Sequence, residues 1–197
     1  MTTIPAPRAL AWAESHKEVA MLSYDPYAAL AELRDFAPMT LTSTDFADGE
    51  ALPLTAWSAG RGGADLSPQL SWSGAPEGTK SFAISCFDPD APTGSGYWHW
   101  AVFNIPADVA SLAAGAGSAG SLALPAAAMM LPNEAGTEHY IGAAPPAGTG
   151  THRYFFVIDA LDVDTLDIAP GSTPAILGFN RHFHSLARGV LIGTATP

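Results

Sequence analysis

The sequence predicts a mainly β protein with short helices toward its two ends. Three segments show the apolar alternation that is typical of buried strands, and they cover residues 81–87, 98–105 and 151–161. Glycine and proline make up about 18% of the chain, above the roughly 12% of an average protein, which indicates many turns. With 197 residues, 48% of them hydrophobic, the chain is long enough to bury one substantial core.

The first 36 residues are predicted to form a helical extension of the β domain, which we place at residues 37–197. Residues 9–22 are rich in alanine and compatible with a helix. Asp25 and Pro26 have the pattern of an N-cap followed by proline at the first helical position. Apolar residues then recur at a spacing of three and give this second helix one apolar face: Tyr27, Leu30, Leu33 and Phe36. We expect the extension to pack on the domain, and a partner-binding helix is the alternative.

Shorter strands are expected around the three central ones, at residues 41–46, 70–72 and 128–131. Cys86 lies in the middle of a predicted central strand, so we interpret it as a buried, inert thiol rather than a nucleophile. Because it is the only cysteine, the chain has no intrachain disulfide.

The C-terminal region is predicted to contain a helix followed by a short strand. Thr173 and Pro174 repeat the cap-and-proline pattern before a helix at residues 176–188, with Gly189 as its C-terminal cap and a strand at 190–192. One face of this helix carries Phe179, His182, Phe183 and Leu186. His182 and His184 are two residues apart and point to different faces, so we interpret them as structural histidines rather than ligands of one metal ion.

The net charge of −11 excludes several classes of partner. The eight lysines and arginines are scattered, so nucleic-acid binding and attraction to anionic membranes are not expected. The N-terminal residues have no continuous apolar segment of the signal-peptide type, and no apolar run reaches the roughly 20 residues of a transmembrane helix. We therefore expect a cytoplasmic protein.

Polar side chains gather at the ends of the three central strands. Alternation places His99 in one row with Ala101 and the other apolar residues of its strand, and it places His152 and Tyr154 in the apolar row of the last strand. Asp88 and Asp90 follow the first strand in a rigid, proline-containing turn, where a carboxylate can orient an imidazole and favour its charged form. The loop at residues 140–146 can offer backbone N–H groups. These features predict a small pocket with an apolar floor and a polar rim.

Other interpretations of these residues stay open. Asp88, His99 and His152 match the composition of a two-histidine, one-carboxylate metal site, which would make the protein a metalloenzyme. Taken singly, each residue could also be an ordinary cap or a satisfied core histidine. A nucleophilic hydrolase is disfavoured, because no Gly-x-Ser-x-Gly motif occurs.

Several motifs resemble the phosphatidylethanolamine-binding protein family. They are Leu-Ser-Pro-Gln-Leu-Ser-Trp at 66–72, Asp-Pro-Asp-Ala-Pro at 88–92, Trp-His-Trp at 98–100 with Asn-Ile-Pro at 104–106, Tyr-Ile-Gly at 140–142 with Pro-Pro at 145–146, and Gly-Thr-His-Arg-Tyr at 150–154. Gly-Phe-Asn at 178–180 and His-Phe-His at 182–184 resemble its bacterial, Raf-kinase-inhibitor-like branch. The resemblance runs in order from about residue 39 to the C-terminus.

The resemblance implies a Greek-key sandwich of two antiparallel sheets with peripheral helices, and a non-enzymatic protein without a cofactor. It also implies a pocket for phosphate or a phosphorylated headgroup, formed by Asp88, Asp90, Pro92, Trp98, His99, Gly142, Ala144, Pro145, Pro146, His152 and Tyr154. Ala144 stands where many relatives have glycine, and its methyl group is expected to narrow the pocket. Inhibition of a kinase or protease partner, as in the eukaryotic branch, is the alternative function, and a homodimer is also open.

Overall fold

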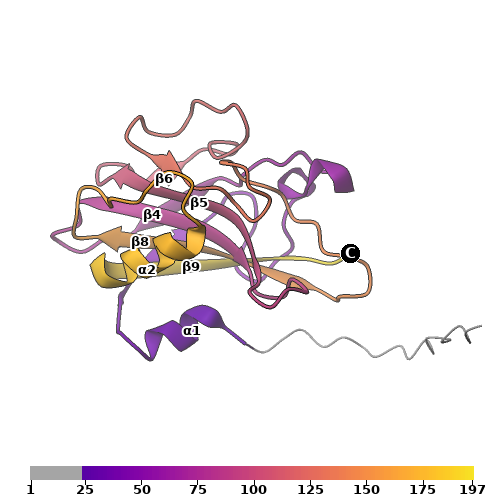
Figure 1. The fold of residues 1–197 in the computed structure, drawn as a ribbon, viewed down its shortest axis with the longest axis horizontal. Helices are drawn as coiled ribbons and strands as arrows, with labels where there is room; N and C mark the ends of the chain where they lie inside the picture. The colour runs from indigo at the N-terminus through magenta and orange to yellow at the C-terminus, as the bar shows by residue number, and fades with distance from the viewer. Residues whose placement is uncertain (1–23) are drawn as a thin grey trace, which may run out of the picture.

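The computed structural model describes residues 24–197 and contains two stacked β-sheets with few helices (Figure 1). The larger sheet has the order β1-β9-β8-β4-β5-β7 and the smaller one the order β2-β3-β6. The strands are β1 (Ala37–Pro38), β2 (Thr40–Thr42), β3 (Leu70–Ser73), β4 (Ser81–Asp88), β5 (Tyr97–Pro106), β6 (Ser111–Leu112), β7 (Met129–Met130), β8 (His152–Leu161) and β9 (Ser185–Ala195). All pairs are antiparallel except the short edge pair of β1 with β9. The predicted mainly β fold is confirmed.

The main core lies between the two sheets. Alternate residues of β8, from Tyr154 to Ala160, pack there against Leu41, Leu70 and Trp72 of the smaller sheet. The opposite row of β8, which includes Phe155, faces the helical side of the larger sheet. The sequence placed His152 and Tyr154 in the inward-facing apolar row of β8, and this prediction is correct. A regular strand of ten residues keeps its alternation from end to end.

Strand β5 departs from simple alternation at two bulges. Its pairing with β4 skips one residue between Trp98 and Trp100, and it sets two residues of β5 opposite one of β4 between Val102 and Ile105. The first bulge adds His99, whose ring lies beside Tyr154 on the inner face, whereas Ala101 packs on the outer face. The sequence-based row that joined His99 to Ala101 was therefore wrong, because an extra residue in one strand shifts every side chain beyond it.

Short helices cover the outer face of the larger sheet. α1 (Pro26–Ala31) begins as predicted at Asp25, whose carboxylate accepts the N–H groups of Tyr27 and Ala28 at 2.8 and 3.0 Å. The helix ends before Leu33, which is 74% exposed, so only part of the predicted apolar face packs on the domain. The helix predicted at residues 9–22 lies outside the described residues.

The C-terminal helix is shorter than predicted, because a long strand begins inside its expected range. α2 (Pro174–His184) is followed at once by β9, which pairs with β8 along its full length. Gly189 is not a helix cap. It lies within β9, where an added Cβ would come within 3.0 Å of the Met39 carbonyl oxygen, so glycine permits this close approach.

The predicted strand at 41–46 stops at Thr42. Side-chain hydrogen bonds replace strand pairing beyond it: the Thr44 N–H donates to the Gln69 amide oxygen, and Asp45 accepts the Gln69 N–H. Within residues 24–197, no helix has the length and apolarity needed to cross a membrane.

Candidate functional site

A cavity of about 320 Å³ opens at the end of the larger sheet where β4 ends and β5 and β8 begin. Nine of the eleven residues predicted for the pocket line it: Asp88, Pro92, His99, Gly142, Ala144, Pro145, Pro146, His152 and Tyr154. The strand ends and the loop at 140–146 therefore converge as predicted. The volume is at the small end of the range for ligand sites.

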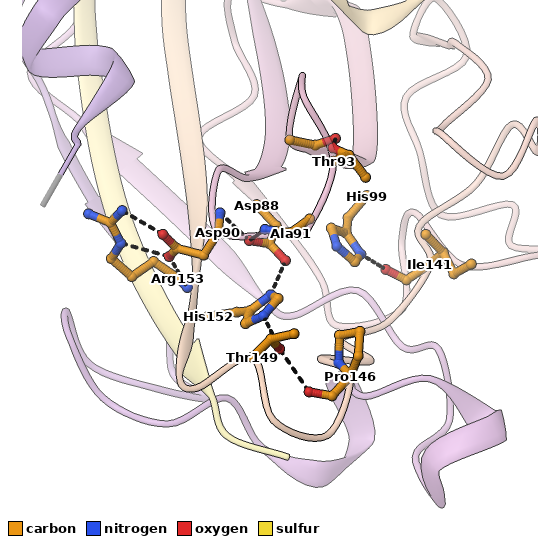
Figure 2. Close-up of polar contacts among 11 residues, drawn as sticks. Asp88, Asp90, Ala91, Thr93, His99, Ile141, Pro146, Thr149, His152 and Arg153 are labelled. Carbon is orange, nitrogen blue, oxygen red and sulfur yellow. Dashed lines mark hydrogen bonds and ion pairs between the residues drawn. The ribbon is translucent and has the colours of Figure 1, made fainter. Parts of the chain in front are cut away.

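Asp88 is the buried centre of the polar network at this cavity. One carboxylate oxygen accepts the N–H groups of Asp90 and Ala91 at 2.8 and 3.0 Å and so closes the turn after β4. The other oxygen accepts from Nδ1 of His152 at 2.8 Å (Figure 2). Burial raises the pKa of Asp88, and the hydrogen bond and charge of His152 oppose that shift.

Both ring nitrogens of His152 are hydrogen-bonded within the protein. Nε2 lies 2.7 Å from the Thr149 hydroxyl oxygen, and that hydroxyl donates to the Pro146 carbonyl at 2.7 Å (Figure 2). Because a carbonyl only accepts, the Thr149 proton points to Pro146, and the Thr149 oxygen accepts from Nε2–H. His152 therefore uses both ring nitrogens within the protein, and neither is left to bond a ligand.

His99 differs from His152 because one of its ring nitrogens faces the cavity. Its Nδ1 lies 2.8 Å from the Ile141 carbonyl oxygen, so Nδ1 carries the proton and Nε2 presents a lone pair. Burial lowers the pKa of His99 to about 4, although the hydrogen bond to Ile141 works in the other direction. At neutral pH His99 is therefore a hydrogen-bond acceptor, whereas the sequence favoured a charged donor.

Tyr154 supplies a donor to the cavity. Its ring packs edge-on against His99, with the ring centres 5.0 Å apart. Burial and then the nearby charge of Asp88 raise the pKa of the phenol, so it stays protonated. The protonated Tyr154 O–H lines the cavity and can donate to a ligand.

Two of the backbone amides expected to face a ligand are already bonded within the protein. The Gly142 N–H donates to Asp65 at 2.7 Å, and the Ala143 N–H donates to the Ala56 carbonyl at 3.1 Å. Gly142 is needed here because an added Cβ would lie 2.2 Å from the Trp57 carbonyl carbon. The loop therefore shapes the cavity more than it offers donors.

Asp90 and Trp98 do not line the cavity. Asp90 forms a bidentate pair with Arg153, with both N···O distances 2.8 Å, and this pair fixes the turn after β4 to the start of β8. Trp98 points to the outer face of the sheet and packs on Phe87, with ring centres 4.4 Å apart. The bulge at His99 explains the difference, since alternation alone cannot show which side of a bulge a residue faces.

Sequence reasoning missed Ser58, Thr93 and Tyr97, which also line the cavity, and Thr149, which bonds to His152. Tyr97 lies two residues before His99, so alternation could have found it. Ser58 and Thr149 lie in loops that carry no pattern. In residues 24–197 no three histidine, cysteine or acidic side chains form a group that could hold a metal ion, so the site of Asp88, His99 and His152 considered from the sequence is not assembled.

Comparisons with known proteins agree with this architecture. The family model described as phosphatidylethanolamine-binding protein matches residues 42–196. The UPF0098 protein YbhB of Escherichia coli (strain K12) is 49% identical over 151 residues, which cover 76% of this chain and 94% of YbhB. LppC of Mycobacterium tuberculosis, which is named as a lipoprotein, is 40% identical over 136 residues, 69% of this chain and 61% of LppC.

Two solved structures have the same fold. The crystal structure of E. coli YbcL, described as a new member of the mammalian PEBP family, has a TM-score of 0.78 and 39% identity, and the match covers 82% of this chain and 99% of YbcL. CT736 of Chlamydia trachomatis, described as a PEBP homologue, has a TM-score of 0.68 and 32% identity over 81% of this chain and 98% of CT736. This chain therefore belongs to the phosphatidylethanolamine-binding protein family.

Proposed function

We propose that this chain is a non-enzymatic binding protein whose cavity holds phosphate or the phosphate of a small phosphorylated headgroup, such as that of phosphatidylethanolamine. The observation that carries the proposal is the pairing, in one cavity, of a donor on Tyr154 and an acceptor on His99, beside the ion pair of His152 and Asp88. No lysine or arginine of the described range lines the cavity, so hydrogen bonds must select the ligand.

A singly protonated phosphate matches these groups. Its P–OH group can donate to Nε2 of His99, and its unprotonated oxygens can accept from the Tyr154 phenol. A dianion has no P–OH group, so an oxygen lone pair of the phosphate would face the lone pair on Nε2 of His99, and the two would repel. The cavity of about 320 Å³ suits a headgroup rather than a lipid with two acyl chains.

The series of Thr149, His152 and Asp88 has the residue types of a hydrolase triad, yet its hydrogen bonds argue against that chemistry. A general base must accept the proton of the nucleophile. The Thr149 hydroxyl gives its proton to the Pro146 carbonyl, and His152 presents an N–H. The thiol of Cys86 is buried and its pKa is raised well above the usual value, which argues against a cysteine nucleophile.

Calorimetry with phosphate and with phosphoethanolamine tests the proposal. Both should bind the wild type, and Tyr154→Phe should weaken both by about 10-fold or more, since it removes a hydrogen bond to a charged group. His184→Ala is the control, because His184 pairs with Asp162 on the surface away from the cavity. If neither compound binds, or if Tyr154→Phe and His184→Ala bind alike, the proposed site is wrong.

We also propose a cytoplasmic location. The relative LppC is named as a lipoprotein, but Cys86, the only cysteine of this chain, is buried within β4 and is not accessible for acylation. Fractionation of the native host should recover the protein without detergent, and recovery in the membrane fraction would contradict this location.

A further inference from the structure

A second cavity, of about 450 Å³, is lined by residues of α1, α2 and the outer face of the larger sheet. Figure 1 shows where these two helices lie. Its walls are apolar side chains from the two helices and from the sheet beneath them: Leu30, Leu33, Phe87, Trp98, Phe179 and Phe183. Leu33, Phe179 and Phe183 stay more than half exposed. So much exposed apolar surface around one groove is typical of a binding site.

Two buried arginines, Arg181 and Arg188, also line this groove. They share one carboxylate, that of the fully buried Asp159, with N···O distances of 3.2 Å for Arg181 and 2.7 Å for Arg188. The cluster therefore holds two positive charges and one negative charge. Within residues 24–197, three donors of this cluster have no hydrogen-bond partner, Nε and Nη1 of Arg181 and Nη1 of Arg188, against one such acceptor, Oδ2 of Asp159. Buried unpaired donors are costly, so a further anion would complete the cluster.

The surroundings add to the positive charge. Arg34 donates to the carbonyl of His182, another residue that lines the groove. Three guanidinium groups thus lie together in a protein of net charge −11. This concentration contrasts with the cavity of His99 and Tyr154, which has no lysine or arginine in its lining.

We propose that the groove binds a single-chain aliphatic carboxylate, such as a medium-chain fatty acid. The carboxylate would accept from Arg181 and Arg188, and the chain would lie between α1 and α2 over Phe87 and Trp98. A peptide fits less well, because the groove lies on a sheet face rather than at a sheet edge and would leave the peptide backbone unpaired.

Calorimetry of the full chain with dodecanoate, below its micellar concentration, is the test. Dodecanoate should bind, and dodecanol of the same length should bind at least 10-fold more weakly because it lacks the charge. Shortening the acid should weaken binding by up to about fourfold per methylene removed.

Gly178→Leu should abolish binding, since Gly178 lines the groove and no atom lies within 4 Å of its added Cβ. Leu33→Asp, at the exposed mouth, should weaken it at least 10-fold by repelling the carboxylate. Leu122→Asp is the matched control, because Leu122 is 97% exposed and lies outside the groove.

Three results would overturn the proposal. Equal binding of dodecanol and dodecanoate would show a nonspecific apolar surface. Unchanged binding in Gly178→Leu, with its fold verified by circular dichroism, would place the ligand elsewhere. A dimer in sedimentation that Gly178→Leu dissociates, without dodecanoate binding by the wild type, would assign the groove to a second copy of the chain.

Discussion

The protonation of His99 decides which anions the cavity can accept. The sequence showed a histidine at a strand end but not the Ile141 carbonyl that takes its Nδ1 proton, because that contact joins residues 42 positions apart. Burial then lowers the pKa of His99 to about 4. The consequence is a difference between anions that carry a proton and anions that do not.

Sulfate and a phosphate monoester should therefore show different pH profiles. Sulfate brings no proton, so it needs protonated His99, and contact with the anion raises the pKa of His99. Its affinity should be greatest below the free-state pKa of about 4 and be lost as the pH rises through the bound-state value. Phosphoethanolamine should bind well at pH 5 and weaken as it loses its second proton near pH 6.

Calorimetry between pH 4 and pH 8 measures both profiles, with circular dichroism to verify the fold at each pH. His99→Gln should remove the pH dependence of sulfate binding. A flat sulfate profile in the wild type would show that His99 does not face the ligand.

His152→Ala should weaken phosphate binding less than Tyr154→Phe does, because both ring nitrogens of His152 are hydrogen-bonded within the protein. It should also lower the free energy of unfolding, by up to about 3–5 kcal/mol, because Asp88 loses its buried partner. Without His152 the burial-raised pKa of Asp88 is unopposed, so the folded state binds a proton more tightly than the unfolded state does. The stability of the variant should therefore fall as the pH rises through the folded-state pKa of Asp88.

Chemical denaturation from pH 4 to pH 8 measures this loss. Asp88→Asn combined with His152→Ala is the control, and it should show a weaker pH dependence. Equal stability of His152→Ala and the wild type at every pH would contradict the buried ion pair.

The turn after β4 shows how one element positions the cavity. Asp90, which the sequence predicted in the pocket, instead connects this turn to β8 through Arg153. Asp90→Ala should lower the free energy of unfolding by about 2–3 kcal/mol, because Arg153 loses its charged partner. Phosphate affinity should fall less than in Tyr154→Phe, since Asp90 does not line the cavity. Denaturation and calorimetry on the same samples separate the two effects, and a larger affinity loss in Asp90→Ala would return Asp90 to the site.

The central strands were predictable and their irregularities were not. Residues 81–87 and 151–161 carry mostly apolar residues in both alternating rows, which is typical of strands covered on both faces, and the structure confirms both strands. The bulge at His99 has no sequence signature, because it follows from how β5 matches β4. Residues 185–188 are compatible with either a helix or a strand, and their pairing with β8 decides for the strand. Local patterns thus specify the fold, and long-range pairing specifies the site.

The cavity of His99 and Tyr154 lies at one end of the larger sheet and the groove lies on its outer face, and only the groove involves the segment before residue 37. Tyr27 of α1 is buried against Phe155, and its hydroxyl lies 3.4 Å from Nη2 of Arg181. The cavity of His99 and Tyr154 has no lining residue from α1. The family match also begins after this segment, at residue 42.

A chain that begins at Ala37 should therefore fold cooperatively and keep its affinity for phosphate. Its free energy of unfolding should fall by about 3–5 kcal/mol, the scale of losing one large buried aromatic side chain, because Phe155 and the arginine cluster lose the cover of Tyr27. Dodecanoate binding should be lost, because the shortened chain lacks the wall of the groove that α1 forms.

Thermal unfolding and calorimetry with both ligands measure these outcomes. Tyr27→Ala in the full chain is the matched variant and should reproduce most of the stability loss. If the shortened chain is insoluble or unfolds without cooperativity, residues 24–36 are part of the domain core rather than an extension packed on it.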